Sequence, residues 1–200
     1  MPQNIGKIFE AQWHKSTPDY ALLYRLPDPA QSFGDSKRLR FSRKPGFDYL
    51  LWDSRRHILY ALELKTVKGK SISFERTEEE RGDIHYEQID ALNKWNRYDG
   101  IICGFVIEFR QMETTVFLHI DHMNRIINEI PKKSFSFNDL EKYDIRYTVI
   151  GQQKLRTKYL YDVDGFLKIN EAFYLRKEED NGEKLRQDDN DDACDVHGDR

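Results

Sequence analysis

The stretch Ile101–Phe109 constrains the fold most strongly, because it is almost continuously apolar. A strand without polar alternation is covered on both faces of its sheet. Further apolar stretches predict strands over residues 20–26, 47–52, 58–65 and 114–120, and helices over residues 5–15, 84–95, 121–130 and 137–143. The order is helix, three strands, helix, two strands, helices. It predicts an α/β fold with a mixed β-sheet flanked by helices on both faces.

The length of 200 residues fits one domain with or without a tail. No run approaches the roughly 18 apolar residues of a membrane helix, and the first four residues do not resemble a signal peptide. We therefore expect a cytoplasmic protein without a membrane partner. Two cysteines, Cys103 and Cys194, exclude a disulfide framework and a four-cysteine zinc site.

Charge is distributed unevenly along the chain. Residues 178–200 hold ten acidic and three basic side chains and show no apolar period, which predicts a disordered acidic tail. Residues 1–177 would form the folded domain and are mildly basic, which fits an anionic partner without establishing one.

Three charged residues stand inside apolar strands. Asp48 lies in the second predicted strand, and Glu63 and Lys65 lie on one face of the third. If a tight turn at Arg55 and Arg56 joins these strands, Asp48 lies directly opposite Glu63, with Cβ atoms about 4.5–5.5 Å apart. Without a functional role, these residues would form a partly exposed acid pair and an ordinary Glu–Lys contact. Charges in strands covered on both faces are rare unless they are paired or coordinating, so a functional site is favoured.

Two carboxylates held so close repel each other, and burial increases the cost. One of them could be protonated, Lys65 could compensate, or a divalent cation could lie between them. Oxygen ligands favour Mg²⁺, which binds through one or two carboxylates together with waters and phosphate oxygens. Water activated by such an ion beside Lys65 could attack phosphorus.

Gln88 falls on the apolar stripe of the helix predicted from Ile84. A buried amide needs hydrogen-bond partners. Gln88 is therefore either satisfied by the backbone or a site residue that orients a water or a phosphate.

The segment 33–45 is basic, and its composition predicts a loop. It is either a solvated loop or an arm that contacts phosphates and brings a polyanion to the acidic site. Its cations are Lys37, Arg38, Arg40, Arg43 and Lys44.

Five short motifs, in order from about Asn4 to Asp144, resemble the RecU family of Holliday junction resolvases of Gram-positive bacteria and their phages. They are Asn4-x-Gly6-Lys7-x-Phe9-Glu10, Pro27-Asp28-Pro29-x-Gln31, Gly46-Phe47-Asp48-Tyr49, Leu62-Glu63-Leu64-Lys65-Thr66 and His85-x-x-Gln88-Ile89. The resemblance implies a restriction-endonuclease-like core, a homodimer and Mg²⁺-dependent cutting of four-way DNA junctions in recombination and repair, with Mn²⁺ as a substitute ion.

By this resemblance, Asp48 and Glu63 would hold the metal and Lys65 would assist the attacking water. Gln88 would support the site, and Glu10 would approach it from the first helix. The family has a long basic stalk where this chain has only the short segment 33–45. A structure-tolerant endonuclease of replication or repair is therefore an alternative, and a branched-DNA-binding recombination module that does not cut is another.

Overall fold

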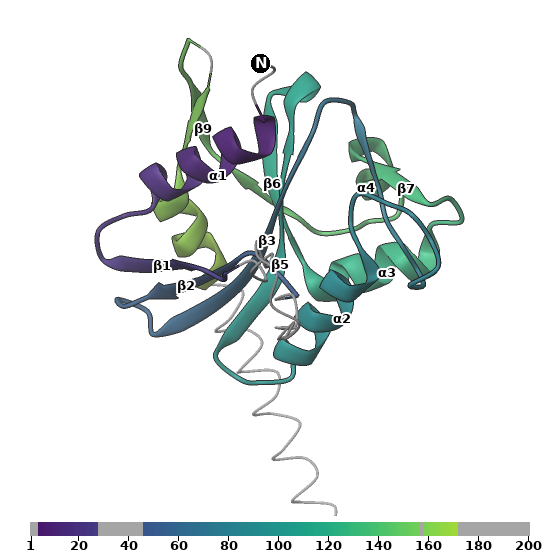
Figure 1. Ribbon diagram of the computed structural model, residues 1–200, viewed down its shortest axis with the longest axis horizontal. Coiled ribbons are helices and arrows are strands. Elements are labelled where there is room, and N and C mark those ends of the chain that lie inside the picture. Colours follow the sequence, from purple (N-terminus) through teal and green to yellow (C-terminus); the bar gives the residue numbers. More distant parts are fainter. Residues whose placement is uncertain (1–3, 28–45, 157, 172–200) are drawn as a thin grey trace, which may run out of the picture. The chain divides into compact units, whose positions relative to one another are not determined.

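A six-stranded mixed sheet forms the centre of the protein (Figure 1). The computed structural model describes residues 4–27, 46–156 and 158–171. Within them the strand order is β1-β2-β3-β5-β6-β8; β3 and β5 are parallel, and the other neighbours are antiparallel. The strands are β1 (Ala21–Arg25), β2 (Tyr49–Asp53), β3 (Ile58–Val67), β5 (Ile101–Phe109), β6 (Thr114–His119) and β8 (Thr148–Ile150).

Helices and short strands complete the described chain. The helices are α1 (Ile5–Ser16), α2 (Tyr86–Trp95), α3 (Ile120–Glu129), α4 (Phe137–Lys142) and a 3-10 turn at Arg110–Met112. The short strands are β4 (Ser71–Ser73) with β7 (Ser134–Ser136), and β9 (Gln152–Lys154) with β10 (Tyr159–Tyr161). Residues 163–171 are helical. The chain divides into two compact units, Met1–Phe166 and Leu167–Arg200, and only 167–171 of the second are described.

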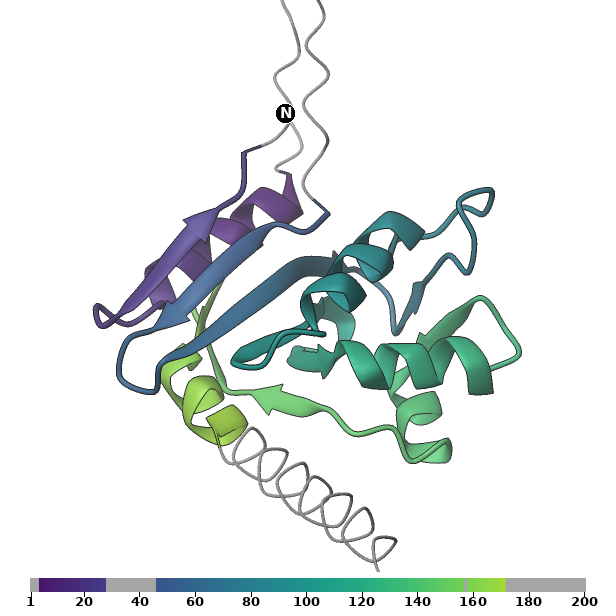
Figure 2. The same cartoon turned by 90° about the horizontal axis from the view of Figure 1, so that it is seen from below.

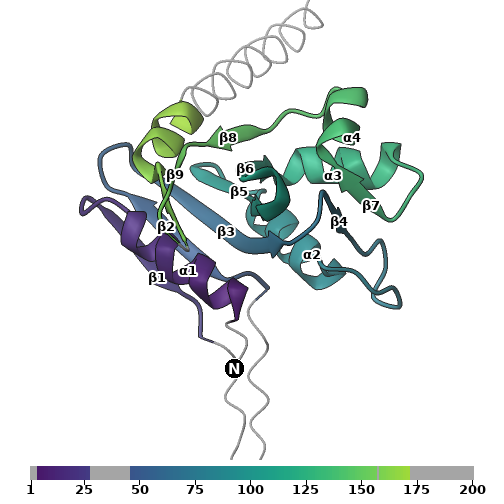
Figure 3. The same ribbon diagram turned by 90° about the horizontal axis from the view of Figure 1, so that it is seen from above.

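Alternation along β3 separates two packed faces. On one face, Tyr60 contacts Phe166, with ring centroids 5.5 Å apart, and Phe166 contacts Trp13 of α1. On the other face, Ala61 belongs to the apolar core that also contains Leu92 of α2. Figure 2 shows the molecule from below, and in Figure 3, seen from above, β3 lies between α1 and α2. The α/β class with helices on both faces is therefore confirmed, and the architecture is consistent with a restriction-endonuclease-like fold.

Strand β5 agrees with its prediction, since every residue from Ile102 to Phe109 is buried. The N-terminus of α1 also agrees, because the Asn4 side chain accepts a hydrogen bond from the Lys7 N–H. None of the helices in the described part of the chain is long and apolar enough to cross a membrane.

Two local predictions were wrong. Helix α2 begins at Tyr86 rather than Ile84, because Ile84 forms a β-bridge with Phe74 and the Asp83 carboxylate accepts from Ser73 instead of capping the helix. The predicted strands and helices leave residues 67–82 without an element, yet Ser71–Ser73 is strand β4. Its partner β7 lies about sixty residues further on, so its pairing depends on tertiary structure.

Several expectations lie outside the described residues. They concern the basic segment 33–45, the motif residues Asp28–Gln31 and the acidic tail 178–200. The domain boundary after residue 177 stays a prediction for the same reason.

Gly46 lets β2 approach α2 closely. A Cβ atom at Gly46 would lie 2.1 Å from the Cβ of Ala91, which is shorter than any real contact between two carbons. Ala91 is part of α2, which also carries Gln88, and Gly46 precedes Asp48 by two residues. The absent side chain therefore sets the distance between two elements that carry predicted site residues.

We predict that Gly46→Ala destabilises the protein by about 1–3 kcal/mol, because the added methyl group forces β2 and α2 apart. Urea unfolding followed by circular dichroism measures the change. Gly69→Ala is the matched control, since a Cβ at Gly69 meets nothing within 4 Å. Equal unfolding midpoints for the two variants would contradict the close approach.

Candidate active site

The β2–β3 hairpin brings Asp48 and Glu63 to facing positions. Cα pairs run from Asp53↔Ile58 to Tyr49↔Leu62, and the Asp48 N–H donates to the Leu62 carbonyl at 3.2 Å. The next pair in this register is Asp48 with Glu63, as the sequence predicted. The turn is longer than expected and spans residues 54–57.

A buried carboxylate fixes this turn. The Asp53 carboxylate is fully buried and accepts from the N–H groups of Arg55 and Arg56 at 3.0 and 3.3 Å. Its other oxygen is 2.7 Å from the Arg56 guanidinium. His57 closes the turn with a positive φ of 57°. The turn therefore sets the register that aligns the two acids five residues away.

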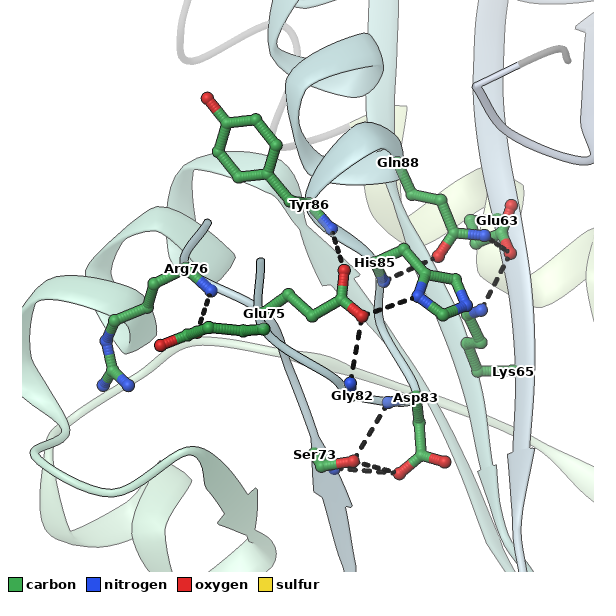
Figure 4. Close-up of polar contacts among 11 residues, drawn as sticks. Glu63, Lys65, Ser73, Glu75, Arg76, Gly82, Asp83, His85, Tyr86 and Gln88 are labelled. Atoms are coloured by element: carbon green, nitrogen blue, oxygen red, sulfur yellow. Dashed lines mark hydrogen bonds and ion pairs between the residues drawn. The ribbon is translucent and has the colours of Figure 1, made fainter. Parts of the chain in front are cut away.

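Glu63 lies at the centre of the site and is almost fully buried (Figure 4). Its Oε1 accepts from the Gln88 side-chain amide and lies 3.2 Å from Nζ of Lys65. Burial raises the pKa of Glu63 to about 8; the Lys65 charge opposes the rise, and the Asp48 carboxylate adds to it. Glu63 and Lys65 are thus paired on one face of β3, as predicted.

Asp48 is only partly buried, and its carboxylate is hydrogen-bonded to the backbone of β3. Its Oδ2 accepts from the Leu64 N–H at 3.0 Å. Burial raises the pKa of Asp48; the Leu64 hydrogen bond opposes the rise, and the Glu10 charge adds to it. The second predicted acid is therefore fixed by the same strand that carries the first.

One oxygen of Glu63 makes the pair suitable for a cation. Its Oε2 is buried and has no hydrogen-bond partner among residues 4–27, 46–156 and 158–171. The neighbouring Asp48 carboxylate offers acceptors only, unless one of the two acids holds a proton. A hard divalent cation would satisfy both. The described part of the chain brings no three acidic, histidine or cysteine side chains together.

Glu10 of α1 lies close enough to Asp48 for its charge to affect the pKa of that residue. The Glu10 carboxylate accepts from the Arg25 guanidinium and the Tyr49 hydroxyl, each at 3.1 Å. These contacts orient it from the other face of the sheet. The predicted approach of Glu10 is thus present in the geometry, whereas its role stays a prediction.

Gln88 is held at both ends of its amide. The side-chain oxygen accepts from the His85 N–H at 3.0 Å, at the start of α2, and the nitrogen donates to Glu63. Gln88 is partly exposed rather than buried. The backbone thus satisfies one end of the amide and Glu63 the other, whereas a role of Gln88 in orienting a water or a phosphate stays a prediction.

Two side chains beside the site were not predicted as site residues. Nδ1 of His85 is 2.9 Å from the Glu75 carboxylate (Figure 4). Next to them is an open cleft of about 270 Å³, lined by Gly46, Glu75, Glu78, His85, Tyr86, Glu87 and Gln88. The signal available in the sequence was the His85-x-x-Gln88 spacing, which puts His85 one turn from Gln88. Glu75 had no such signal, because it lies in a polar stretch that resembles a loop.

The fold and these contacts define a class: an α/β protein whose mixed sheet carries a facing acid pair beside a lysine and a glutamine. No family model matches the chain. The SPbeta prophage-derived uncharacterized protein YotM of Bacillus subtilis (strain 168) is 32% identical over 178 residues, which cover 87% of this chain and 84% of the relative. The chain therefore belongs to the family of this prophage-derived protein.

Among solved structures, the Holliday junction resolvase Hjc of Archaeoglobus fulgidus aligns with 66% of this chain and 85% of its own. The sequence identity is 13% and the TM-score is 0.39. This likeness is too low to define either fold or activity.

We predict that Glu63 makes the metal-free protein less stable as the pH rises. A carboxyl whose pKa is raised on folding stabilises the fold fully below its unfolded pKa, near 4.5, and this stability is lost as the pH rises through about 8. The free energy of unfolding should fall over this range by at most about 1.4 kcal/mol per pH unit from this group. Urea unfolding in a chelator, from pH 5 to 8, measures the slope.

Glu63→Gln should flatten that slope, because the amide does not titrate. Glu141→Gln is the matched control, since Glu141 is exposed on α4. An unchanged slope in Glu63→Gln would contradict the raised pKa.

Proposed function

We propose that this protein is a Mg²⁺-dependent DNA endonuclease, and specifically a Holliday junction resolvase that acts as a homodimer in the cytoplasm. The observation that carries the proposal is the buried Oε2 of Glu63, which has no partner within the described part of the chain and lies beside Asp48 and next to Lys65. Binding of DNA alone requires positively charged side chains. It does not require two acids held together at a cost, whereas phosphodiester hydrolysis uses such a pair to hold a metal.

Asp48 and Glu63 would hold Mg²⁺, for which Mn²⁺ could substitute. When bound, the ion would polarise the phosphate and lower the pKa of a water. The chain's own residues prepare the site: the Gln88 amide fixes the Glu63 carboxylate, and the Leu64 N–H fixes that of Asp48. Both carboxylates are therefore positioned before any ligand arrives.

Lys65 is a further polar group beside the acid pair. Its Nζ lies 3.2 Å from Oε1 of Glu63, and the side chain is 16% exposed. From there the ammonium group can hydrogen-bond a water or a phosphate oxygen while it stays paired with Glu63. It would orient the attacking water and stabilise the negative charge that develops on the phosphate.

The substrate proposal rests on the chain's motifs and on its family. The motif order resembles the RecU resolvases, and the relative YotM is named as prophage-derived, in agreement with the phage members of that group. Four-way DNA requires two nicks on opposite strands, and a homodimer supplies two sites in one particle. The predicted basic segment 33–45 would contact the DNA through Lys37, Arg38, Arg40, Arg43 and Lys44.

A structure-tolerant endonuclease of replication or repair is the second candidate. The shortness of segment 33–45 favours it, because a short arm offers less surface to recognise the centre of a junction. The chemistry at Asp48, Glu63 and Lys65 would be the same, so the two candidates differ only in substrate choice.

We predict that the protein nicks labelled DNA with Mg²⁺ and not in a chelator. Asp48→Asn should lower the rate by about 100-fold or more, the scale of losing a group that stabilises developing charge. Asp99→Asn is the control, because Asp99 is exposed. If Asp48→Asn cuts as fast as the control, the assignment of the site is wrong.

Metal binding has a readout that does not depend on cutting. Mn²⁺ should raise the melting temperature of the unmodified protein and of Asp99→Asn, because a ligand that binds only the folded state stabilises it. Asp48→Asn should show little shift. A protein that binds branched DNA yet never nicks it with either ion would instead be a non-cutting recombination module.

Substrate choice separates the two nuclease candidates. A junction resolvase should cut a synthetic four-way junction at least about tenfold faster than a linear duplex of the same sequence, a difference of about 1.4 kcal/mol in the barrier. Symmetrical nicks across the junction should accompany that preference. Equal rates on the two substrates would support the structure-tolerant nuclease.

A further inference from the structure

His85 is oriented by a carboxylate that is itself firmly held. The Glu75 carboxylate is buried and accepts from the N–H groups of Gly82 and Tyr86, at 3.0 and 2.9 Å, as well as from Nδ1 of His85. Burial works to raise the pKa of Glu75, but the hydrogen bonds from His85, Tyr86 and Gly82 together lower it. Glu75 therefore stays ionised and holds the ring with Nδ1–H directed at it.

The opposite edge of the ring, which carries Nε2, is available to a ligand. The His85 side chain is 48% exposed and lines the cleft of about 270 Å³. A water molecule occupies about 30 Å³, so the cleft can hold a substrate group beside the ring. In Figure 4 this edge points away from Glu75 and toward the side where Lys65 and Glu63 lie. The charged groups around the ring are Glu75, Glu78 and Glu87 of the cleft, with Lys65 on the side of the acid pair.

The backbone of His85 connects this histidine to the acid pair. Its N–H donates to the Gln88 amide, whose nitrogen donates to Glu63. The cleft and Glu63 thus share Gln88 as a common wall. His85 is oriented by a carboxylate, is half exposed, and is connected to the acid pair through Gln88. Such an arrangement is typical of an acid–base group.

We propose that His85 is a catalytic acid of the reaction, held by Glu75 as a positioning residue; this inference rests on the proposed nuclease function. The oxygen of the attacking water forms the new bond to phosphorus and releases its proton to solvent. The bond from phosphorus to the leaving sugar oxygen breaks, and its electron pair stays on that oxygen. The proton on Nε2 of His85 moves to this oxygen, and the imidazole is left neutral with Nδ1–H on Glu75.

The test uses DNA in which sulfur replaces the leaving oxygen at the mapped cut position. A thiolate leaves without protonation, because thiols are far stronger acids than alcohols, with a pKa of about 8.5. His85→Asn removes the imidazole but keeps a side-chain amide toward Glu75 and a favourable helix N-cap. On the natural phosphodiester it should cut about 100-fold slower than the unmodified protein; on the sulfur ester it should cut within about threefold.

Two further variants complete the design. Glu75→Gln should lose less activity than His85→Asn on the natural phosphodiester, and the sulfur ester should restore it too, because Glu75 acts through His85. His14→Asn is the matched control, since His14 is exposed on α1. Circular dichroism and the Mn²⁺-induced rise in melting temperature should be the same in all variants.

The outcomes separate the two proposals. If the unmodified protein cuts and His85→Asn cuts equally well, or loses activity equally on both esters, the role of His85 is overturned while the nuclease stands. If the unmodified protein cuts no DNA with Mg²⁺ or Mn²⁺, both proposals fall.

Discussion

The structure holds two carboxylates close together, and the charge of Lys65 offsets their repulsion only in part. Asp48 and Glu63 face each other on two hydrogen-bonded strands. Glu63 is almost fully buried, and the pKa of each acid is raised. Lys65 and Gln88 hold the buried Glu63 carboxylate through an ion pair and a hydrogen bond.

The surrounding elements act together to hold that arrangement. The Asp53 turn sets the register, Gly46 permits the contact between β2 and α2, and the parallel pairing of β3 with β5 places α2 beside the acids. These features position the two carboxylates through the backbone rather than through direct side-chain contacts. A one-residue slip of β2 would turn Asp48 to the opposite face of the sheet.

Local patterns were sufficient for five of the six strands of the described sheet and for the facing positions of Asp48 and Glu63. Apolar runs indicate β1, β2, β3, β5 and β6, and counting back from the hairpin turn aligns Asp48 with Glu63. The short strands β4 and β7 were not predictable, because three polar-flanked residues pair only when distant segments meet. Glu75 was missed for the same reason: its partners Gly82, His85 and Tyr86 come together only when the loop folds back on α2.

Gln88 gives the molecule a property that neither the helix nor the sheet would have alone. One amide both closes the first turn of α2 and steadies the buried acid of β3. If that turn frays, Glu63 loses its donor at the same moment. The hydrogen bond from Gln88 to Glu63 therefore depends on the first turn of α2, which couples the start of a helix to a carboxylate inside the sheet.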